Sequence, residues 1–345
     1  MPVGGTSGWS NMTLRMEATT SVGGSQLRVD LSNEFASQPV TFAHVSVAQQ
    51  LNGAQTFGSP VGLTFGGSTS VTLAAGAEVA SDPIAFPTTR GERLLVSVFL
   101  PVSTSVLTAN AHAYSSETEY NIVGQDATMA SNPPVNNTFQ FTSYLNGVDV
   151  DATTSQTVVA IGDSITDTGG TPADTDTRWP DYLAHRTSYA VINQGISGNW
   201  VTPGSGTGLP LTQRWQHDVL NVPGARTVID AGGINDLRGG VSATTLEQAQ
   251  ASLVQSAHAA GLRILLSTIT PCAGASNCGG AFEAQRQAYN AWVRGGSSGA
   301  DGVADFDSAV GAGAALAGMY DDGGHIHPNS AGEAAMANVI DTSKL

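Results

Sequence analysis

Long apolar runs and basic residues are both scarce in this sequence of 345 residues. No window approaches the run of about 18 apolar residues that a membrane-spanning helix needs. Only 13 Lys and Arg residues stand against 28 Asp and Glu residues, which gives a formal net charge of -15. Nucleic acids and anionic membrane surfaces are bound through clusters of Lys and Arg, so we expect neither as a partner.

Cysteine is also scarce, since the chain has only Cys272 and Cys278, in the segment PCAGASNCGG. The two are too far apart for a thioredoxin-like C-x-x-C pair and lack partner ligands at zinc-finger spacing. We therefore expect a disulfide across a short loop, with two free thiols as the alternative.

A disulfide in turn favours a secreted protein. The first residues, MPVGGTSGW, have no charged stretch followed by an apolar one, so we expect a secreted chain without its signal peptide, or a cytosolic one. The last residues, SKL, match a peroxisomal address and contain Lys344, the only lysine. Because a disulfide and peroxisomal import do not fit together well, the secreted location is favoured and the peroxisomal one is the alternative.

With 41% apolar and 12% charged residues, the chain can bury two cores. The pattern of apolar residues along the sequence changes near the middle of the chain. Short alternating apolar runs broken by Gly, Pro, Asn and Ser extend from Gln26 to about Leu145, as in Leu27, Val29 and Leu31. This alternation predicts antiparallel strands with one buried face. We therefore assign residues 1–150 to an all-β domain, a sandwich or a jelly roll.

After Gln156 the apolar runs become nearly continuous and alternate with helical segments. The runs are TVVAIG, YAVIN, RTVIDAGG and RILLSTI. Continuous apolar strands are typical of a sheet covered on both faces. Residues 151–345 are therefore predicted to form a three-layer α/β/α domain with a parallel sheet.

Four segments of this second half hold the polar residues that could carry chemistry. They are GDSI at 162–165, NQGISGN at 193–199, GGIND at 232–236 and GGHIHPN at 323–329. Loops at the carboxyl edge of a parallel sheet converge, so residues distant in sequence can share one cleft. There Ser164 could be a nucleophile with a histidine as its base, while Gly198 and Asn235 could donate to an oxyanion together with the Ser164 N–H.

These four blocks, in this order, resemble those of the SGNH/GDSL hydrolase superfamily of esterases and lipases. The similarity extends to LRVDLSNEF from Leu27, SDPIAF from Ser81 and RWPDYLA from Arg178, as in the branch with a β-rich N-terminal domain. The resemblance implies a flavodoxin-like catalytic domain without cofactor or metal. It also implies Ser164 as nucleophile, His327 as base, and Gly198 and Asn235 as oxyanion donors.

The last block departs from the family pattern, which has an aspartate three residues before the histidine. Gly324 stands there, whereas Asp322 and Asp321 lie five and six residues before His327. The Gly324 carbonyl could accept a hydrogen bond from Nδ1 and leave a Ser–His dyad, or the chain could fold back so that Asp322 reaches the ring. The dyad is the arrangement we favour.

Several alternatives remain beside this interpretation. His325 competes with His327 as base, and an H-I-H pair beside Asp321 and Asp322 could hold a metal, although further ligands after earlier strands are missing. Trp179 and Trp200 flank the site loops; core packing is expected, with an acyl or sugar pocket as the alternative.

The sequence therefore predicts a serine esterase acting on carboxylic esters, most simply short-chain acyl or acetyl esters. The first alternative is an esterase of acetylated polysaccharides whose β domain binds sugar. The second is a binding protein that has lost catalysis. The expected partner is thus a small-molecule or polysaccharide ester.

Overall fold

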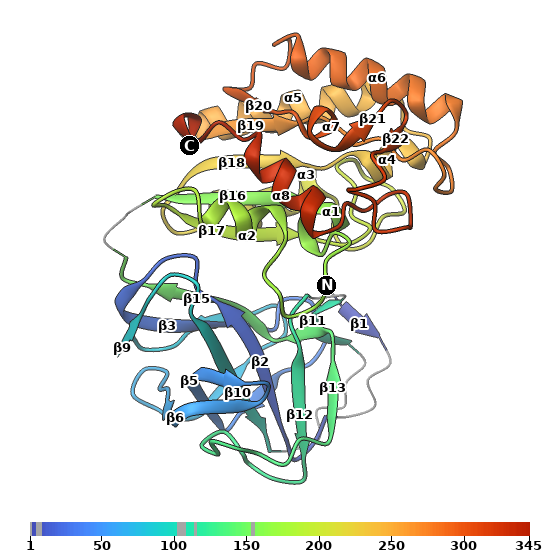
Figure 1. The fold of residues 1–345 in the computed structure, drawn as a ribbon. Helices are drawn as coiled ribbons and strands as arrows, with labels where there is room; N and C mark the ends of the chain where they lie inside the picture. The colour runs from blue at the N-terminus through green and yellow to red at the C-terminus, as the bar shows by residue number, and fades with distance from the viewer. Residues whose placement is uncertain (1, 5–8, 102–107, 114–115, 153–155) are drawn as a thin grey trace. The chain divides into compact units, whose positions relative to one another are not determined.

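The computed structural model describes residues 2–4, 9–101, 108–113, 116–152 and 156–345. The chain divides into two compact units, Met1–Thr153 and Thr154–Leu345 (Figure 1). The first is built of strands and the second of alternating strands and helices.

The first unit consists of antiparallel sheets, which confirms the predicted all-β class. Its largest sheet has the order β13-β12-β2-β10-β5-β6, and a second has β15-β3-β8 with β9 also paired to β3. Smaller sheets have the orders β1-β11-β14 and β4-β7. The strands are β1 (Pro2–Gly4), β2 (Met12–Thr19), β3 (Gly24–Ser32), β4 (Val40–Phe42), β5 (His44–Asn52), β6 (Gln55–Gly62), β7 (Val71–Leu73), β8 (Glu78–Ala80), β9 (Ile84–Thr88), β10 (Arg93–Leu100), β11 (Thr108–Ala113), β12 (Glu119–Val123), β13 (Asn137–Phe139), β14 (Phe141–Ser143) and β15 (Leu145–Val150).

The alternating apolar positions of these strands form one buried core. Leu27, Val29 and Leu31 of β3 are at most 1% exposed, and Val96 and Val98 of β10 are fully buried in the same cluster. The two larger sheets therefore share a single hydrophobic interior.

The second unit has a five-stranded parallel sheet with the order β17-β16-β18-β19-β20. Numbered within this unit, the order is 2-1-3-4-5, the flavodoxin-like arrangement, which confirms the predicted fold class. Its strands are β16 (Thr157–Gly162), β17 (Ala190–Gly195), β18 (Ala225–Ala231), β19 (Arg263–Ser267) and β20 (Gly302–Ala304), followed by the small hairpin of β21 (Gly311–Ala312) and β22 (Ala315–Leu316). In such a sheet the ligand crevice lies beyond the carboxyl ends of the first and third strands, here β16 and β18.

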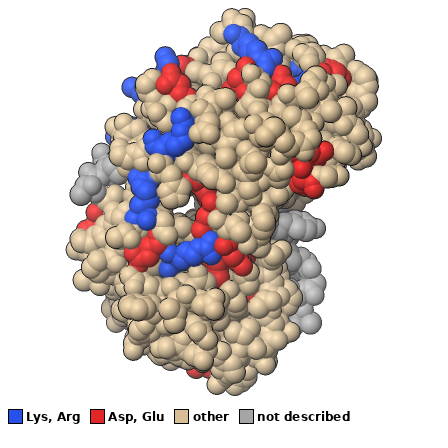
Figure 2. Space-filling view, viewed as in Figure 1, with Lys and Arg blue, Asp and Glu red and all other residues tan. Residues whose placement is uncertain are grey.

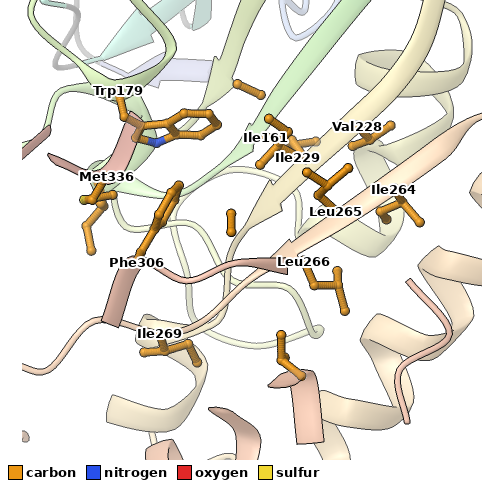
Figure 3. Close-up of a cluster of buried hydrophobic side chains, with 14 of the residues drawn as sticks. Ile161, Trp179, Val228, Ile229, Ile264, Leu265, Leu266, Ile269, Phe306 and Met336 are labelled. Carbon is orange, nitrogen blue, oxygen red and sulfur yellow. The ribbon is translucent and has the colours of Figure 1, made fainter. Parts of the chain in front are cut away.

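Helices pack in two groups about this sheet, α2 with α7 and α8, and α5 with α4 and α6 (Figure 1). The helices are α1 (Ser164–Asp167), α2 (Trp179–Ala184), α3 (Leu211–Trp215), α4 (Ile234–Arg238), α5 (Ala243–Ala259), α6 (Gly280–Arg294), α7 (Phe306–Val310) and α8 (Ser330–Asn338), with a π-helical turn at Gln216–Leu220 and a 3₁₀ turn at Thr342–Lys344. Figure 3 shows the core between the first group and the sheet, where Trp179, Phe306 and Met336 lie near one another. Trp179 is fully buried, its indole centroid 5.3 Å from that of the Phe306 ring, so it belongs to the core and does not line a pocket.

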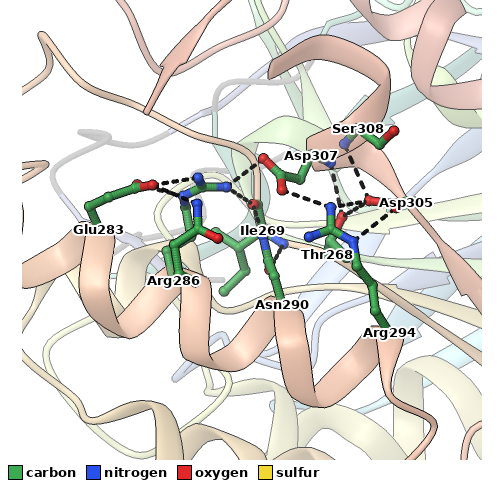
Figure 4. Close-up of polar contacts among 10 residues, drawn as sticks. Thr268, Ile269, Glu283, Arg286, Asn290, Arg294, Asp305, Asp307 and Ser308 are labelled. Atoms are coloured by element: carbon green, nitrogen blue, oxygen red, sulfur yellow. Dashed lines mark hydrogen bonds and ion pairs between the residues drawn. The ribbon is translucent and has the colours of Figure 1, made fainter. Parts of the chain in front are cut away.

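The loop after β19 is held by α6 through a buried polar network (Figure 4). The Asn290 amide accepts from Ile269 N and donates to Ile269 O, at 2.8 and 3.0 Å. The fully buried Arg286 side chain also donates to Ile269 O and pairs with Glu283 and Asp307. Because the backbone of Ile269 is fixed in this way, the segment that continues to Cys272 leaves the sheet in one direction.

Cys272 and Cys278 form a disulfide, as predicted. In the described residues no helix is long and apolar enough to cross a membrane. On the face seen in Figure 2, most atoms belong to uncharged residues and the Lys and Arg side chains are few and scattered. This surface agrees with the small number of basic residues in the sequence.

Candidate active site

Ser164 lies just beyond the end of β16, separated from Gly162 by Asp163 alone, at the carboxyl edge of the sheet. Asp163 caps α1 by accepting a hydrogen bond from Ile165 N at 3.1 Å, so the strand turns sharply and Ser164 becomes the first helical residue. Gly162 has no room for a side chain, since a Cβ there would lie 2.5 Å from Thr166 Oγ1. The tight turn leaves the Ser164 side chain partly exposed.

Asp163 is fully buried beneath this turn, and one of its oxygens, Oδ2, has no hydrogen-bond partner among the described residues. Burial raises the pKa of the Asp163 carboxyl to about 7. The group is an anchor of the turn, in agreement with the structural role of a helix N-cap.

His327 lies in the loop before α8, and its Nε2 is 2.9 Å from Ser164 Oγ. The loop is held by Asn329, which caps α8 by accepting from Ala331 N and Gly332 N and donates its amide to the carbonyls of Met319 and Asp321. Gly170 N also donates to the Pro328 carbonyl at 2.8 Å, which ties this loop to the chain that follows α1. Two segments 163 residues apart in sequence thus meet at hydrogen-bond distance.

Three effects set the basicity of His327. Burial lowers the pKa of the imidazole below its ordinary value, and the Arg238 guanidinium lowers it further. The Asp322 carboxylate acts in the opposite direction and raises the pKa. The net shift is downward, so the ring is a neutral base at neutral pH.

Asp322 lies on the Nδ1 side of the His327 ring, and its Oδ2 is 3.9 Å from Nδ1. Its Oδ1 accepts a hydrogen bond from Gly324 N at 2.7 Å, which pins the carboxylate. Gly170 packs against this side chain, because a Cβ there would lie 2.4 Å from the Asp322 Cβ. The carboxylate is therefore within ion-pair distance of the ring but beyond hydrogen-bond distance.

Within the described part of the chain, Nδ1 of His327 has no hydrogen-bond acceptor. The bond to the Gly324 carbonyl that we favoured from the sequence is therefore not formed. The reason is local: the N–H of Gly324 turns towards Asp322, and the turn continues through His325, whose φ of 64° is left-handed.

His325 points to different partners from His327. Its Nδ1 is 2.6 Å from Asp321 Oδ2, and its ring packs on Gly274 in the disulfide loop, where a Cβ would lie 2.8 Å from the ring. Among the described residues, neither histidine belongs to a group of three side chains whose ligand atoms lie close enough together to hold a metal ion. The two histidines of the H-I-H segment therefore have different partners: His327 contacts Ser164, whereas His325 contacts Asp321.

Gly198 lies in a loop that is fixed against α1. Ser197 donates through both its N–H and its hydroxyl to Asp167 Oδ2, at 2.8 and 2.7 Å, and Ile196 N donates to the Gly162 carbonyl. Gly198 has a φ of 78°, and a Cβ there would lie 2.6 Å from Thr207 Oγ1. Only glycine suits this conformation and this space.

Asn235 stands on α4, after the end of β18, and its side chain is held at both ends. Nδ2 donates to the Asn199 carbonyl at 3.1 Å, and Oδ1 accepts from Arg238 Nη1 at 3.3 Å. The neighbouring Asp236 accepts from Val201 N and Thr202 N, both at 2.9 Å. These contacts connect α4 to the loop that carries Gly198.

Arg214 is a residue of this site that sequence reasoning missed. Its buried guanidinium donates to the carbonyls of Gly162 and Gln194 and to Asn199 Oδ1, while Asp218 pairs with it at 2.7 Å. It therefore joins the ends of β16 and β17 to the Gly198 loop. The only sequence signal was the Arg–Asp pair four residues apart, which on a helix is most often a surface ion pair.

Trp200 follows Asn199 and is half-buried. Its ring lies against Gly204, Gly206 and Gly239, at each of which a Cβ would come within 2.4 Å of an indole carbon. The indole is thus packed by backbone on several sides, which agrees with the packing role expected for it.

The chain belongs to the GDSL-like lipase/acylhydrolase family, because the sequence model of that family matches residues 160–335. It is a carboxylic ester hydrolase of this type.

The solved structures it resembles include an aryl esterase from M. smegmatis, with 16% identity over 53% of this chain and 95% of the other and a TM-score of 0.45. A carbohydrate acetylesterase family member from Sinorhizobium meliloti has 18% identity over 53% of this chain and 94% of the other, with a TM-score of 0.45. A carbohydrate esterase family 2 enzyme plus carbohydrate binding domain from Corynascus thermopiles covers 98% of this chain and 96% of its own, with 14% identity and a TM-score of 0.41. No curated protein matches the chain.

Proposed function

We propose that this protein hydrolyses carboxylic esters through an acyl-enzyme formed on Ser164. The observation that carries the proposal is the 2.9 Å distance between Ser164 Oγ and His327 Nε2. His327 takes the hydroxyl proton as Oγ bonds to the ester carbonyl carbon. When the tetrahedral intermediate collapses, the ester C–O bond breaks and His327 gives the proton to the departing alcohol. Water then attacks the acyl-enzyme in the same way and releases the acid.

The oxyanion of each intermediate is held by three donors in this proposal: the N–H groups of Ser164 and Gly198, and the Asn235 amide. Support comes from the way each is fixed, Ser164 by the Asp163 cap, Gly198 by the contacts of its loop with α1, and Asn235 by bonds at both ends of its amide. Donors that need no reorganisation during the reaction are the most effective ones.

Covalent labelling tests the nucleophile. A fluorophosphonate should add to the protein with one equivalent per chain, and mass spectrometry of the digest should place the adduct on Ser164. The His327→Gln variant should react at least about a hundredfold more slowly, because general-base activation contributes about that much or more. An unlabelled protein, or an adduct on another serine, would contradict the proposal and favour a binding protein without catalysis.

Asp322 is the displaced third member of the site in this proposal. Its carboxylate stabilises the imidazolium across 3.9 Å without accepting the Nδ1 proton in the free enzyme. Hydrogen bonds of catalytic groups are often long before substrate binds, and about 1 Å of movement would bring this one into range.

Asp322→Asn should lower kcat by about 10- to 100-fold, because the imidazolium loses its counter-charge. Since Asp322 raises the pKa of His327, its removal should also move the acid limb of the kcat/KM profile to lower pH. Asp321→Asn is the matched control, because Asp321 pairs with His325 and should leave that limb in place. Stopped-flow or steady-state rates on p-nitrophenyl acetate from pH 4.5 to 9 measure both effects. If Asp322→Asn changed neither kcat nor the acid limb of the kcat/KM profile, Asp322 would have no catalytic role and the site would be a Ser–His dyad.

We propose short-chain acyl or acetyl esters as substrates. The acidic chain offers little attraction for anionic substrates, which favours neutral ones. A series of p-nitrophenyl esters from acetate to laurate should give the highest kcat/KM at two to four acyl carbons. A secreted location is also proposed, and the disulfide supports it.

A further inference from the structure

Arg238 lies at the end of α4, one helical turn after Asn235, and its side chain connects Asn235 to the disulfide loop. Nη1 donates to Asn235 Oδ1 at 3.3 Å. Nε and Nη2 donate to the Ser276 carbonyl at 3.3 and 3.0 Å. Ser276 belongs to the loop closed by the disulfide, so the guanidinium has a fixed anchor on one side and the amide on the other.

The orientation of the Asn235 amide decides whether it can serve as an oxyanion donor. The nitrogen end has two N–H groups, one of which donates to the Asn199 carbonyl. In the described part of the chain the other has no acceptor, so it is available to a ligand. If the amide flipped by 180°, Oδ1 would face the Asn199 carbonyl and Nδ2 would face the guanidinium. Both contacts would be repulsive.

We propose that Arg238 is a positioning residue for ester hydrolysis, which fixes the Asn235 amide with its N–H edge towards the reacting carbonyl. The inference rests on the proposed function of the site. Arg238 does not touch the substrate in this account. Its effect passes through Asn235, and the Ser276 carbonyl keeps the guanidinium in place.

The charge of Arg238 gives the proposal a second, independent readout. Among the charged groups, Arg238 on α4 and Asp322 on the His327 loop act on His327, the first lowering and the second raising its pKa. Loss of the Arg238 charge should therefore raise the pKa of His327. A base that titrates at higher pH moves the acid limb of kcat/KM to higher pH, opposite to the shift expected for Asp322→Asn.

A double-mutant cycle tests the coupling on p-nitrophenyl acetate. Arg238→Gln should lower kcat about tenfold with KM nearly unchanged, because about nine in ten of the amides would leave the donor orientation. In the Asn235→Ala background the same change should lower kcat less than about twofold, since the residue through which it acts is gone. An equal loss in both backgrounds, or a loss confined to KM, would overturn the proposal.

Arg238→Lys separates orientation from charge. Lysine keeps the positive charge but lacks the planar fork that reaches both Asn235 and Ser276. We expect kcat to fall as in Arg238→Gln while the acid limb stays at its wild-type pH. An acid limb that does not move in Arg238→Gln, or that moves equally in Arg238→Lys, would contradict the electrostatic role.

Arg226→Gln is the control for loss of a positive charge, because Arg226 is exposed at the start of β18, at the sheet edge opposite the site. It should leave kcat and the acid limb unchanged, and all variants should unfold at similar temperatures. Ser164→Ala distinguishes two failures. If it retains activity, the proposed function itself fails; if it is inactive and the cycle is additive, only the role of Arg238 is overturned.

Discussion

Ser164→Ala should lower kcat on short p-nitrophenyl esters by about 10⁴-fold or more, because it removes the atom that forms the acyl-enzyme. His327→Ala should cost nearly as much, and the double variant hardly more than either single one, since the two residues act as a unit. The activity that remains over water would come from substrate binding and the oxyanion donors.

Stability should not account for this loss. The Ser164 hydroxyl bonds only to His327 within the described residues, so the alanine variant should differ from wild type by about 0.5 kcal/mol or less in the free energy of unfolding. Ser252→Ala is the matched control, because among the described residues its hydroxyl bonds only to the Gln248 carbonyl of the same helix, α5. Initial rates, with protein concentrations determined by absorbance at 280 nm, measure the effect. More than a tenth of wild-type kcat in Ser164→Ala would exclude Ser164 as the nucleophile.

Asn235→Ala should lower kcat by about 10²- to 10³-fold and leave KM nearly unchanged, as expected when a donor acts on the transition state and not on the bound ester. Asn235→Asp should lower kcat even further. The aspartate has the shape of asparagine, but its carboxylate cannot donate a hydrogen bond, and its negative charge repels the oxyanion. Both should be compared with Asn221→Ala, whose side chain accepts only from Gln216 among the described residues. A loss carried by KM would assign Asn235 to ground-state binding and not to the oxyanion.

The convergence of the site was predictable because it follows from a general property of parallel sheets. Ser164 and Asn235 lie in the segments that follow buried strands, and the carboxyl ends of such strands share one edge. The continuous apolar runs revealed the strands, and the position of Ser164 after the first strand then followed. The strands of the first unit could also be predicted from a general property, because successive residues of a strand point to opposite faces and apolar residues therefore alternate with polar ones.

The orientation of His327 could not be predicted, since it depends on a turn of five residues whose backbone takes a left-handed step at His325. The sequence shows that Asp322 lies five residues before His327. It does not show that the N–H of Gly324 would donate a hydrogen bond to the Asp322 carboxylate and so fix its orientation. The roles of Arg214 and Arg238 could not be predicted for another reason. A single arginine on a short helix is usually a surface residue, and only the tertiary structure shows which carbonyls and amides it reaches.

The disulfide loop also matters for how this protein is prepared. Its Ser276 carbonyl holds Arg238, and its Gly274 supports the ring of His325. A chain made in a reducing cytoplasm would keep Cys272 and Cys278 as two thiols, and its loop would lack the covalent closure. Different batches would then contain different fractions of fully competent enzyme, so specific activity should be compared only after the thiol content of each batch has been measured.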